Sequence, residues 1–246
     1  MRLLTLALLA ALAAAPVAAQ SDTAAHATFH IVPRRPVESL RVEALTRSPP
    51  PGLEGTRPAD LVELVALDST IRLDIRYATT NNFMRAAMYS QARAFLQRPA
   101  AVALVRVHRA LAREGYGLLI HDAYRPWYVT WMFWEATPDS QHTFVADPTT
   151  GSRHNRGAAV DLTLFDRATG RPVRMPSGYD EFSARAYPSY RGGTADETKR
   201  RDLLRRFMER EGFVVNPTEW WHFDFTGWRD YPVLNVPFER LGVSGR

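Results

Sequence analysis

The sequence SRHNRGAAVDLTLF at residues 152–165 joins a polar loop to a predicted strand and carries a histidine and a carboxylate. Residues 158–165 alternate, with valine and leucine side chains opposite Asp161, which is the period of a β-strand. His154 lies in the loop, seven residues before Asp161. Gly157 allows the loop to fold over, because glycine adopts backbone conformations that are closed to other residues. We therefore expect the two side chains to converge on one ion.

A second stretch, EWWH near the C-terminus, supplies another carboxylate and another imidazole in a chain without cysteine. Three nitrogen or oxygen ligands, an open position for water and a spare carboxylate are sufficient for a catalytic zinc site. Glu219 and His222 are three residues apart, which on a regular strand would send them to opposite faces. We therefore expect Glu219 at an irregular start after Pro217, with the strand proper beginning at Trp220 or Trp221.

Together, the pattern S-x-H-x-x-G-x-A-x-D and the later E-x-W-H resemble the D-alanyl-D-alanine dipeptidase family of zinc peptidases. DIRYATTNNF at residues 74–83 and DAYRP at residues 122–126 match family segments in the same order. The resemblance covers most of the chain beyond about residue 60. Four matches in order argue against chance agreement.

The resemblance implies a metal site with one zinc ion per chain. His154, Asp161 and His222 would be the zinc ligands, and Glu219 would be the catalytic base. A lone histidine is more often a hydrogen-bonded residue at the edge of a core. Two histidines, each with a nearby carboxylate and each within a family motif, favour the metal.

The resemblance also implies how the substrate is held. Arg125 would stabilise the transition state, and the alternative is a structural salt bridge to Asp122. Asp180 and Ser152 would receive the free amino end of the substrate, although Asp180 taken alone is an ordinary loop acid. The chain departs from the family pattern at Arg153, where a small hydroxyl residue is expected.

Composition indicates a globular protein of 246 residues, with 46% hydrophobic and 23% charged residues and room for one domain with appendages. Residues 1–19 predict a cleaved signal peptide, because a positive charge precedes a short apolar run and small residues. A membrane span would need about 20 strongly apolar residues. We therefore expect an exported, periplasmic protein with no stable membrane anchor after cleavage.

The rest of the chain divides into two parts. Residues 20–58 are rich in proline and predict an arm or linker, and residues 59–246 form the zinc dipeptidase catalytic domain that the resemblance implies. Periodicity predicts helices over residues 98–114, 127–136 and 194–211, and strands over residues 71–77, 118–121, 158–165, 213–215 and 220–225.

These elements predict the α+β class: a single domain with a central, largely antiparallel sheet flanked by helices, and the zinc site at the sheet face. The arginines in residues 200–210 alternate with acids and have no aromatic platform, so they indicate a solvated helix face and no nucleic-acid partner. The sequence gives no indication of oligomeric state.

Three functions fit these features. The first is zinc-dependent hydrolysis of the small peptide D-Ala-D-Ala; the second is a carboxypeptidase that removes D-Ala from longer peptidoglycan stems. The third is a non-catalytic zinc domain that binds wall peptide, against which the presence of Glu219 and Arg125 argues. Export favours a role in cell-wall peptide turnover over antibiotic resistance, because a resistance dipeptidase must act in the cytosol before precursors are built.

Overall fold

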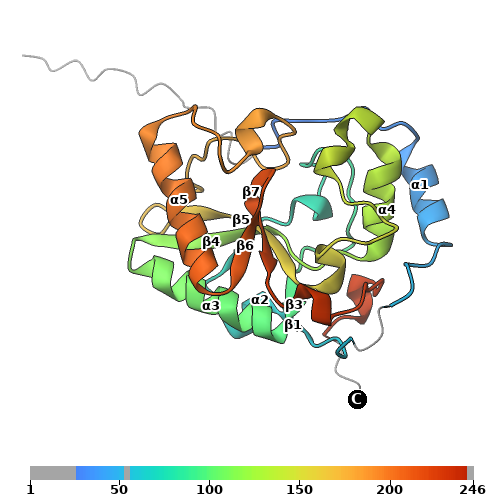
Figure 1. Ribbon diagram of the computed structural model, residues 1–246, viewed down its shortest axis with the longest axis horizontal. Helices are drawn as coiled ribbons and strands as arrows, with labels where there is room; N and C mark the ends of the chain where they lie inside the picture. Colours follow the sequence, from blue (N-terminus) through green and yellow to red (C-terminus); the bar gives the residue numbers. More distant parts are fainter. Residues whose placement is uncertain (1–25, 53–55, 243–246) are drawn as a thin grey trace, which may run out of the picture.

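The strands form one five-stranded and one two-stranded sheet in the computed structural model, which describes residues 26–52 and 56–242 (Figure 1). The large sheet has the order β2-β4-β5-β7-β6, in which only the β2–β4 pair is parallel. Its strands are β2 (Arg72–Leu73), β4 (Tyr116–Asp122), β5 (Ala159–Asp166), β6 (Phe213–Asn216) and β7 (Glu219–Phe225). The small sheet pairs β1 (Leu61–Glu63) with β3 (Phe95–Gln97). The predicted α+β class with a largely antiparallel sheet is confirmed.

Helices lie on both sides of the large sheet (Figure 1). They are α1 (Val37–Ala44), α2 (Leu64–Leu67), α3 (Arg98–Ala112), α4 (Trp127–Ala136) and α5 (Ala195–Arg210). Helices α3 and α5 pack on the sheet and on each other, whereas α4 packs against α1. A capping box formed by Thr194 and Glu197 begins α5, and α4 has the predicted bounds.

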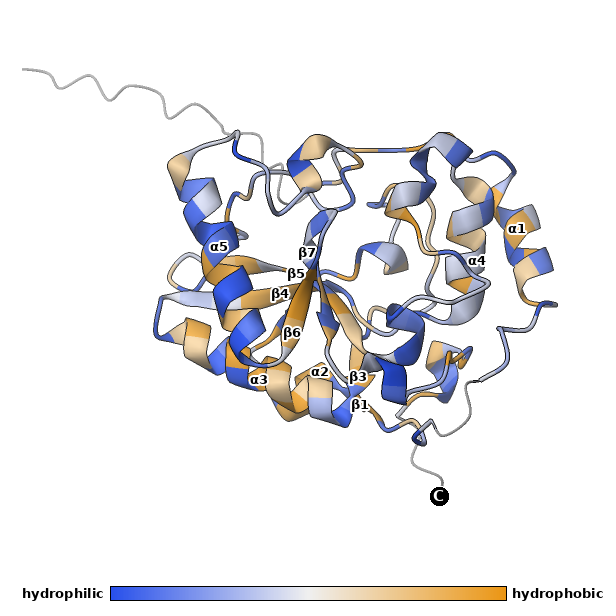
Figure 2. Cartoon of the chain, in the orientation of Figure 1, coloured by the Kyte–Doolittle hydropathy of each residue, from blue (hydrophilic) through white to orange (hydrophobic). Residues whose placement is uncertain are grey.

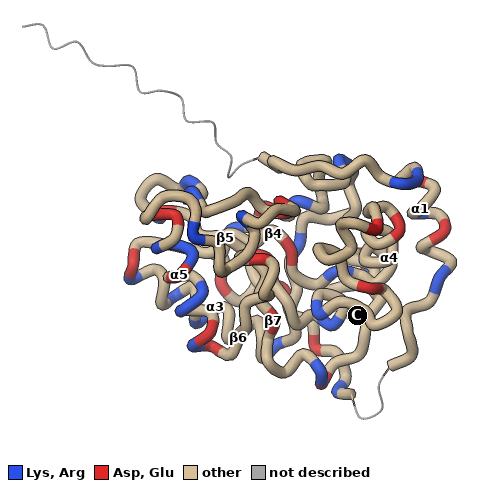
Figure 3. Tube along the Cα trace, turned by 45° about the horizontal axis from the view of Figure 1, so that its top comes forward, with Lys and Arg blue, Asp and Glu red and all other residues tan. Residues whose placement is uncertain are grey.

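Hydropathy follows this arrangement, since the strands are mainly hydrophobic and α5 is mainly hydrophilic (Figure 2). Lysine and arginine alternate with acids along α5 (Figure 3). Arg205 pairs with Glu209 at 2.7 Å, and Arg201 pairs with Asp202 at 2.8 Å. Among the described residues, no helix has both the length and the apolar character that a membrane crossing requires.

The strand predicted over residues 71–77 was wrong in extent. β2 has only two residues, and a single 3₁₀ turn, Arg76–Ala78, follows it. Arg76 is buried and its Nε lies 2.6 Å from a carboxylate oxygen of Asp74, so the chain turns inward where the alternation predicted a continuing strand. This turn carries Tyr77 to the side of the sheet where the cavity lies.

The proline-rich arm contains α1, which the sequence interpretation did not predict. Leu40 and Ala44 of this helix are buried, so the arm packs on the domain and is not a free linker over these residues. The expected signal peptide falls outside the described residues.

Pairing across β4, β5 and β7 sets the position of the site. Asp161 lies opposite Asp122 on one side and opposite His222 on the other. The register of the β4–β5 pair shifts at His121, and the register of the β6–β7 pair shifts after Val215. Three polar side chains therefore meet in one row across the middle of the sheet.

Candidate active site

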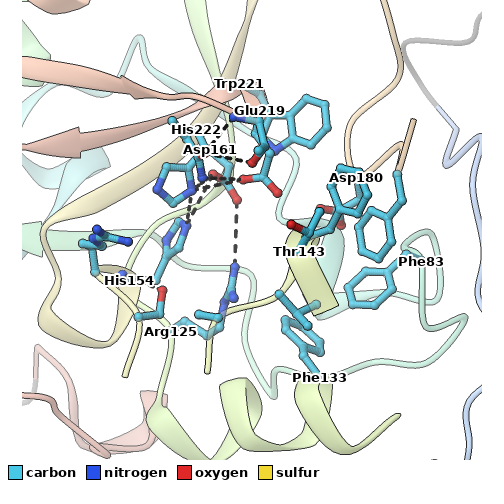
Figure 4. Close-up of a pocket in the computed structure, with 18 of the residues that line it drawn as sticks. Phe83, Arg125, Phe133, Thr143, His154, Asp161, Asp180, Glu219, Trp221 and His222 are labelled. Atoms are coloured by element: carbon cyan, nitrogen blue, oxygen red, sulfur yellow. Dashed lines mark hydrogen bonds and ion pairs between the residues drawn. The ribbon is translucent and has the colours of Figure 1, made fainter. Parts of the chain in front are cut away.

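Three buried side chains bring their ligand atoms together. His154 lies in the 3₁₀ turn His154–Arg156, while Asp161 and His222 lie on paired strands. Nε2 of His154 is 3.3 Å from Oδ1 of Asp161 and 3.2 Å from Nδ1 of His222, which is 3.0 Å from the same Oδ1. The structure thus brings together the three residues predicted as metal ligands, and they point toward one another in Figure 4.

The turn that carries His154 depends on Gly157, as the sequence predicted. Gly157 has a φ of +63°, in the left-handed region that favours glycine. A Cβ there would lie 2.3 Å from Cδ2 of Leu61, so a larger residue would also collide with the packed chain. The backbone N–H of Arg125 donates to the carbonyl of His154 at 3.2 Å, which ties the turn to the neighbouring loop.

Hydrogen bonds on the far side of each ring orient the two histidines. Nδ1 of His154 lies 2.6 Å from the carbonyl of Ala123, and Nε2 of His222 lies 2.9 Å from Oδ1 of Asp224. In the neutral rings these nitrogens carry the proton, because carbonyl and carboxylate oxygens only accept. The inward nitrogens then present lone pairs, which is how ligating histidines are held in metalloproteins.

The donor set fits a divalent metal ion. Oδ1 of Asp161 is buried and accepts no hydrogen bond from the described residues. Zinc binds nitrogen and oxygen at about 2.0–2.1 Å in a tetrahedron, whose edge is then about 3.3 Å, close to the three measured separations. Burial lowers the pKa of His222, but the carboxylates of Asp224 and Asp161 outweigh it and raise that pKa well above its usual range. The carboxylates therefore make the space between the three side chains favourable for a positive charge.

Glu219 stands beside the cluster, and an irregular strand puts it there. Asn216 pairs with Glu219 while Val215 pairs with Phe223, so β7 has extra residues between two successive pairs. This irregularity brings Oε2 of Glu219 to 3.6 Å from Nδ1 of His222 despite their offset of three. The irregular strand was predicted, but β7 begins at Glu219 itself and not at Trp220 or Trp221.

The environment of Glu219 suits proton transfer. Burial raises its pKa to about 7, and the nearby Asp161 carboxylate adds to the effect, while His222 and Arg125 oppose it. A carboxylate whose pKa lies near the working pH can both accept and release a proton. Asn216 donates to Oε2 at 3.2 Å and fixes the side chain.

Arg125 is buried and forms a salt bridge with Asp122, the structural role that the sequence left open as an alternative. Its Nε and Nη2 donate to Oδ2 of Asp122 at 3.0 and 2.8 Å. The same Nη2 lies 3.9 Å from Oδ2 of Asp161, and the guanidinium lies 4.9 Å from the ring centroid of Phe133. Arg125 therefore sits beside the ligand cluster with its orientation fixed by Asp122, and it lines the cavity.

A cavity of about 360 Å³ opens onto these residues. That volume is in the range of small-molecule sites. Asp180 lines the cavity opposite His154 and Arg125, near Phe83 and Thr143 (Figure 4).

Asp180 is a buried acid held by a phenol. Tyr77 donates its hydroxyl to Oδ2 of Asp180 at 2.7 Å. Burial raises the pKa of Asp180 well above its usual range, and the charge of Asp161 raises it further. A carboxylate whose ionisation is opposed in this way gains strongly from a cation that reaches it.

Ser152 and Arg153 precede the turn. Ser152 lines the cavity, and its Oγ accepts a hydrogen bond from the His154 N–H at 3.1 Å. Arg153 is half exposed, lies 4.8 Å from the ring centroid of Trp228, and has its Nε 3.5 Å from Oδ2 of Asp224. The pairing with Asp224 directs this cation toward the outer side of His222.

Sequence reasoning assigned no role to two of the residues that support the ligands. Asp224 orients His222, and the strand alternation placed the two on one face, so this signal was available. Tyr179 donates to Oδ2 of Asp161 at 3.0 Å from a loop, where no periodicity marks it. Trp221 packs edge-on against Tyr179 and forms part of the cavity wall.

Comparison with known proteins finds a family model and several similar sequences. A family model described as D-ala-D-ala dipeptidase matches residues 57–238. A D-alanyl-D-alanine dipeptidase of Escherichia coli strain K12 is 37% identical over 179 residues, which cover 73% of this chain and 91% of the relative. A D-alanyl-D-alanine dipeptidase of Enterococcus faecium is 33% identical over 190 residues, which cover 69% of this chain and 91% of the relative. Among solved structures, the LdcB LD-carboxypeptidase superposes distantly, with a TM-score of 0.39 and 20% identity over 72% of this chain and 73% of its own.

We predict that His222→Ala loses its metal. Removing one of three protein ligands leaves two, too few to retain a divalent ion through gel filtration. Elemental analysis of the purified variant should find far less than one equivalent, whereas the control His26→Ala, which changes an exposed histidine, should retain the wild-type content. A full equivalent bound to His222→Ala would contradict the ligand assignment.

Proposed function

This chain belongs to the D-alanyl-D-alanine dipeptidase family of M15 metallopeptidases, and from that premise we propose that it is a zinc-dependent dipeptidase that hydrolyses D-Ala-D-Ala. The family membership confirms the resemblance drawn from the motifs. The observation that carries the proposal is the convergence of His154, Asp161 and His222 with Glu219 beside them at one end of a cavity.

Zinc is the metal that this donor set suits best, since two imidazoles and one carboxylate leave a fourth position open. When bound, the ion would supply a Lewis acid for the peptide carbonyl and would acidify a water molecule. Glu219 takes the proton from the attacking water and returns it to the leaving amine, because its carboxylate adjoins the cluster and is itself no part of the ligand set.

Arg125 stabilises the negative charge that develops on the carbonyl oxygen. Its guanidinium is buried beside Asp161 and is held by Asp122, so it needs no reorganisation when the charge appears. Preorganised cations in sites shielded from water contribute strongly to catalysis for this reason. The salt bridge to Asp122 and the catalytic role are thus compatible.

Asp180 receives the ammonium group of the substrate at the other end of the cavity, with Ser152 contributing from the side of the ligand turn. A buried carboxylate favours the binding of a peptide with a free ammonium group and disfavours the binding of an acylated peptide, which cannot supply the charge. This favours a dipeptidase over a carboxypeptidase that acts on longer stems. The presence of both Glu219 and Arg125 favours an enzyme over a binding domain.

We place the reaction in cell-wall peptide turnover outside the cytosol. The support is the apolar leader at residues 1–19, which would direct export to the periplasm. An exported dipeptidase meets wall-derived peptides and cannot deplete D-Ala-D-Ala before it enters precursors in the cytosol.

We predict that Glu219→Gln keeps its metal and loses turnover. The amide cannot accept the proton, and a positioned general base contributes roughly 100- to 10,000-fold. Hydrolysis of D-Ala-D-Ala should be followed together with zinc content, and Glu114→Gln, the same change at an exposed acid that does not line the cavity, serves as the control. If Glu219→Gln lost zinc while a metal-replete sample stayed active, Glu219 would be a ligand and not the base.

We predict that Arg125→Lys lowers kcat by roughly 100- to 1,000-fold, the effect of removing one oxyanion donor, with little change in KM. Lysine retains a cation for the buried Asp122, so the fold is preserved better than with alanine. Steady-state kinetics on D-Ala-D-Ala provide the measurement. A change confined to KM would make Arg125 an anchor for the substrate carboxylate instead.

We predict that acetyl-D-Ala-D-Ala is a poor substrate. Acetylation removes the charge that Asp180 recognises, and a charge-assisted hydrogen bond contributes about 1.5–3 kcal/mol, or roughly 10- to 100-fold. The value of kcat/KM should be compared for both peptides in the wild type and in Asp180→Asn, where the preference should shrink. Equal values in the wild type would favour the carboxypeptidase.

A further inference from the structure

Residues 27–31 of the arm bind two separate loops that line the cavity. The first loop follows the Arg76–Ala78 turn: Ala27 donates its N–H to Oδ1 of Asn81 at 2.7 Å, and Ile31 donates its N–H to the carbonyl of Phe83 at 3.0 Å. These bonds fix the backbone of the loop that places Phe83 in the cavity wall.

The second loop is the one that carries Asp180. The Thr28 hydroxyl donates to Oε2 of Glu181 at 3.3 Å, and the same oxygen accepts the N–H of Gly178 at 3.1 Å. A Cβ on Gly178 would lie 2.4 Å from Oγ1 of Thr28, so the arm and this loop are in direct contact. The carboxylate of Glu181 therefore joins the arm to the start of the loop.

An aromatic cluster connects the arm to the cavity itself. The ring of Phe29 lies 4.7 Å from the ring of Phe182, which lies 5.2 Å from Phe83 and stacks on Phe144 at 4.8 Å. Phe83, Phe144 and Phe182 all line the cavity, whereas Phe29 packs behind them. Phe29 thus packs against the outer side of Phe182 and does not itself line the cavity.

The backbone of Asp180 needs such support. Its φ is +56°, a left-handed conformation that a residue with a side chain keeps only where its surroundings hold it. Phe182 is two residues further on, and Tyr77 holds the carboxylate. Contacts of the arm with Glu181 and Phe182 restrict the backbone next to this strained position.

Residues 27–31 lie outside the part of the chain that the family model matches, which begins at residue 57. In Figure 1 the arm runs from the loops above the sheet toward α1 and α4. In Figure 4 Asp180 and Phe83 lie across the cavity from His154. The arm contacts are therefore at the end of the cavity remote from the predicted metal ligands.

We propose that residues 27–31 determine substrate length by bracing the wall at the amino end of the cavity, so that a free dipeptide is accepted and an amino-acylated or longer peptide is excluded. This inference rests on the proposed dipeptidase function and on the placement of the ammonium at Asp180. Phe29 acts through Phe182 and is a positioning residue, since it touches no substrate.

The test compares Phe29→Ala, Phe29→Tyr and the control Val32→Ala, which alters an arm residue that is 86% exposed. The readout is the ratio of kcat/KM for D-Ala-D-Ala to that for acetyl-D-Ala-D-Ala in the full-length zinc enzyme. Phe29→Ala should lower this ratio by about tenfold, since small displacements in a site cost factors of this order or more. Phe29→Tyr, which keeps the ring, and Val32→Ala should retain the wild-type ratio. A loss of folded protein would reduce both rates alike and leave the ratio unchanged.

A second measurement separates this inference from the proposed function. The dissociation constants of both peptides are measured by calorimetry for zinc-loaded Glu219→Gln and for the same protein with Phe29→Ala. If the wild type hydrolyses neither peptide, the proposed function fails, yet a lower preference for the free peptide in the Phe29→Ala protein still supports the arm as the determinant. An unchanged ratio in kinetics and in binding, or binding of neither peptide, would overturn the inference.

Discussion

Two imidazole nitrogens and a carboxylate oxygen, all buried and 3.0–3.3 Å apart, repel one another unless a cation lies between them. The sheet enforces this arrangement, because Asp161 and His222 are direct partners on β5 and β7. The outer nitrogens of both rings are already bound to Ala123 and Asp224, so the inward lone pairs cannot turn away. A metal ion bound here would therefore be coupled to the stability of the central strands, as expected where ligands come from the core.

Different environments give the buried carboxylates around one cavity different chemistry. Asp122 accepts hydrogen bonds from Arg125 and Tyr89, and it is the structural counter-ion of Arg125. Burial raises the pKa of Glu219 to about 7, which suits proton transfer, and burial raises the pKa of Asp180 as well. The cavity thus carries an excess of acidic groups at two ends, one suited to a metal ion and the other to an ammonium group. Under the proposed function, a substrate with a free amino group would bring a cation to Asp180, whereas a neutral amide would bring none.

The sequence predicted those parts of the molecule that local patterns control. Helix α4 was predicted with its observed bounds because Pro126 precedes an aromatic-rich run, and the position of β5 follows from its alternation. The short β2 was not predicted, because the burial of Arg76 depends on its pairing with Asp74 and on the packing of the turn. Tyr179 was missed for a similar reason: its bond to Asp161 joins a loop to a strand 18 residues away.

The role that we propose for the arm is that of a segment outside a shared catalytic domain that restricts which substrates the domain accepts. In the proposed mechanism, hydrolysis needs the ligand cluster, a base and a cation near the oxyanion, and no bond is found between these groups and residues 27–31. Under the proposal, substrate length depends instead on whether the far wall of the cavity stays closed, and that wall is made of loops. Contacts from other segments restrict the conformations that such loops adopt. Since Phe182 contacts Phe29, Phe83 and Phe144 at once, the arm restrains the wall at the point where its loops meet. The proposal therefore implies that changes in the arm would alter specificity while leaving the catalytic groups in place.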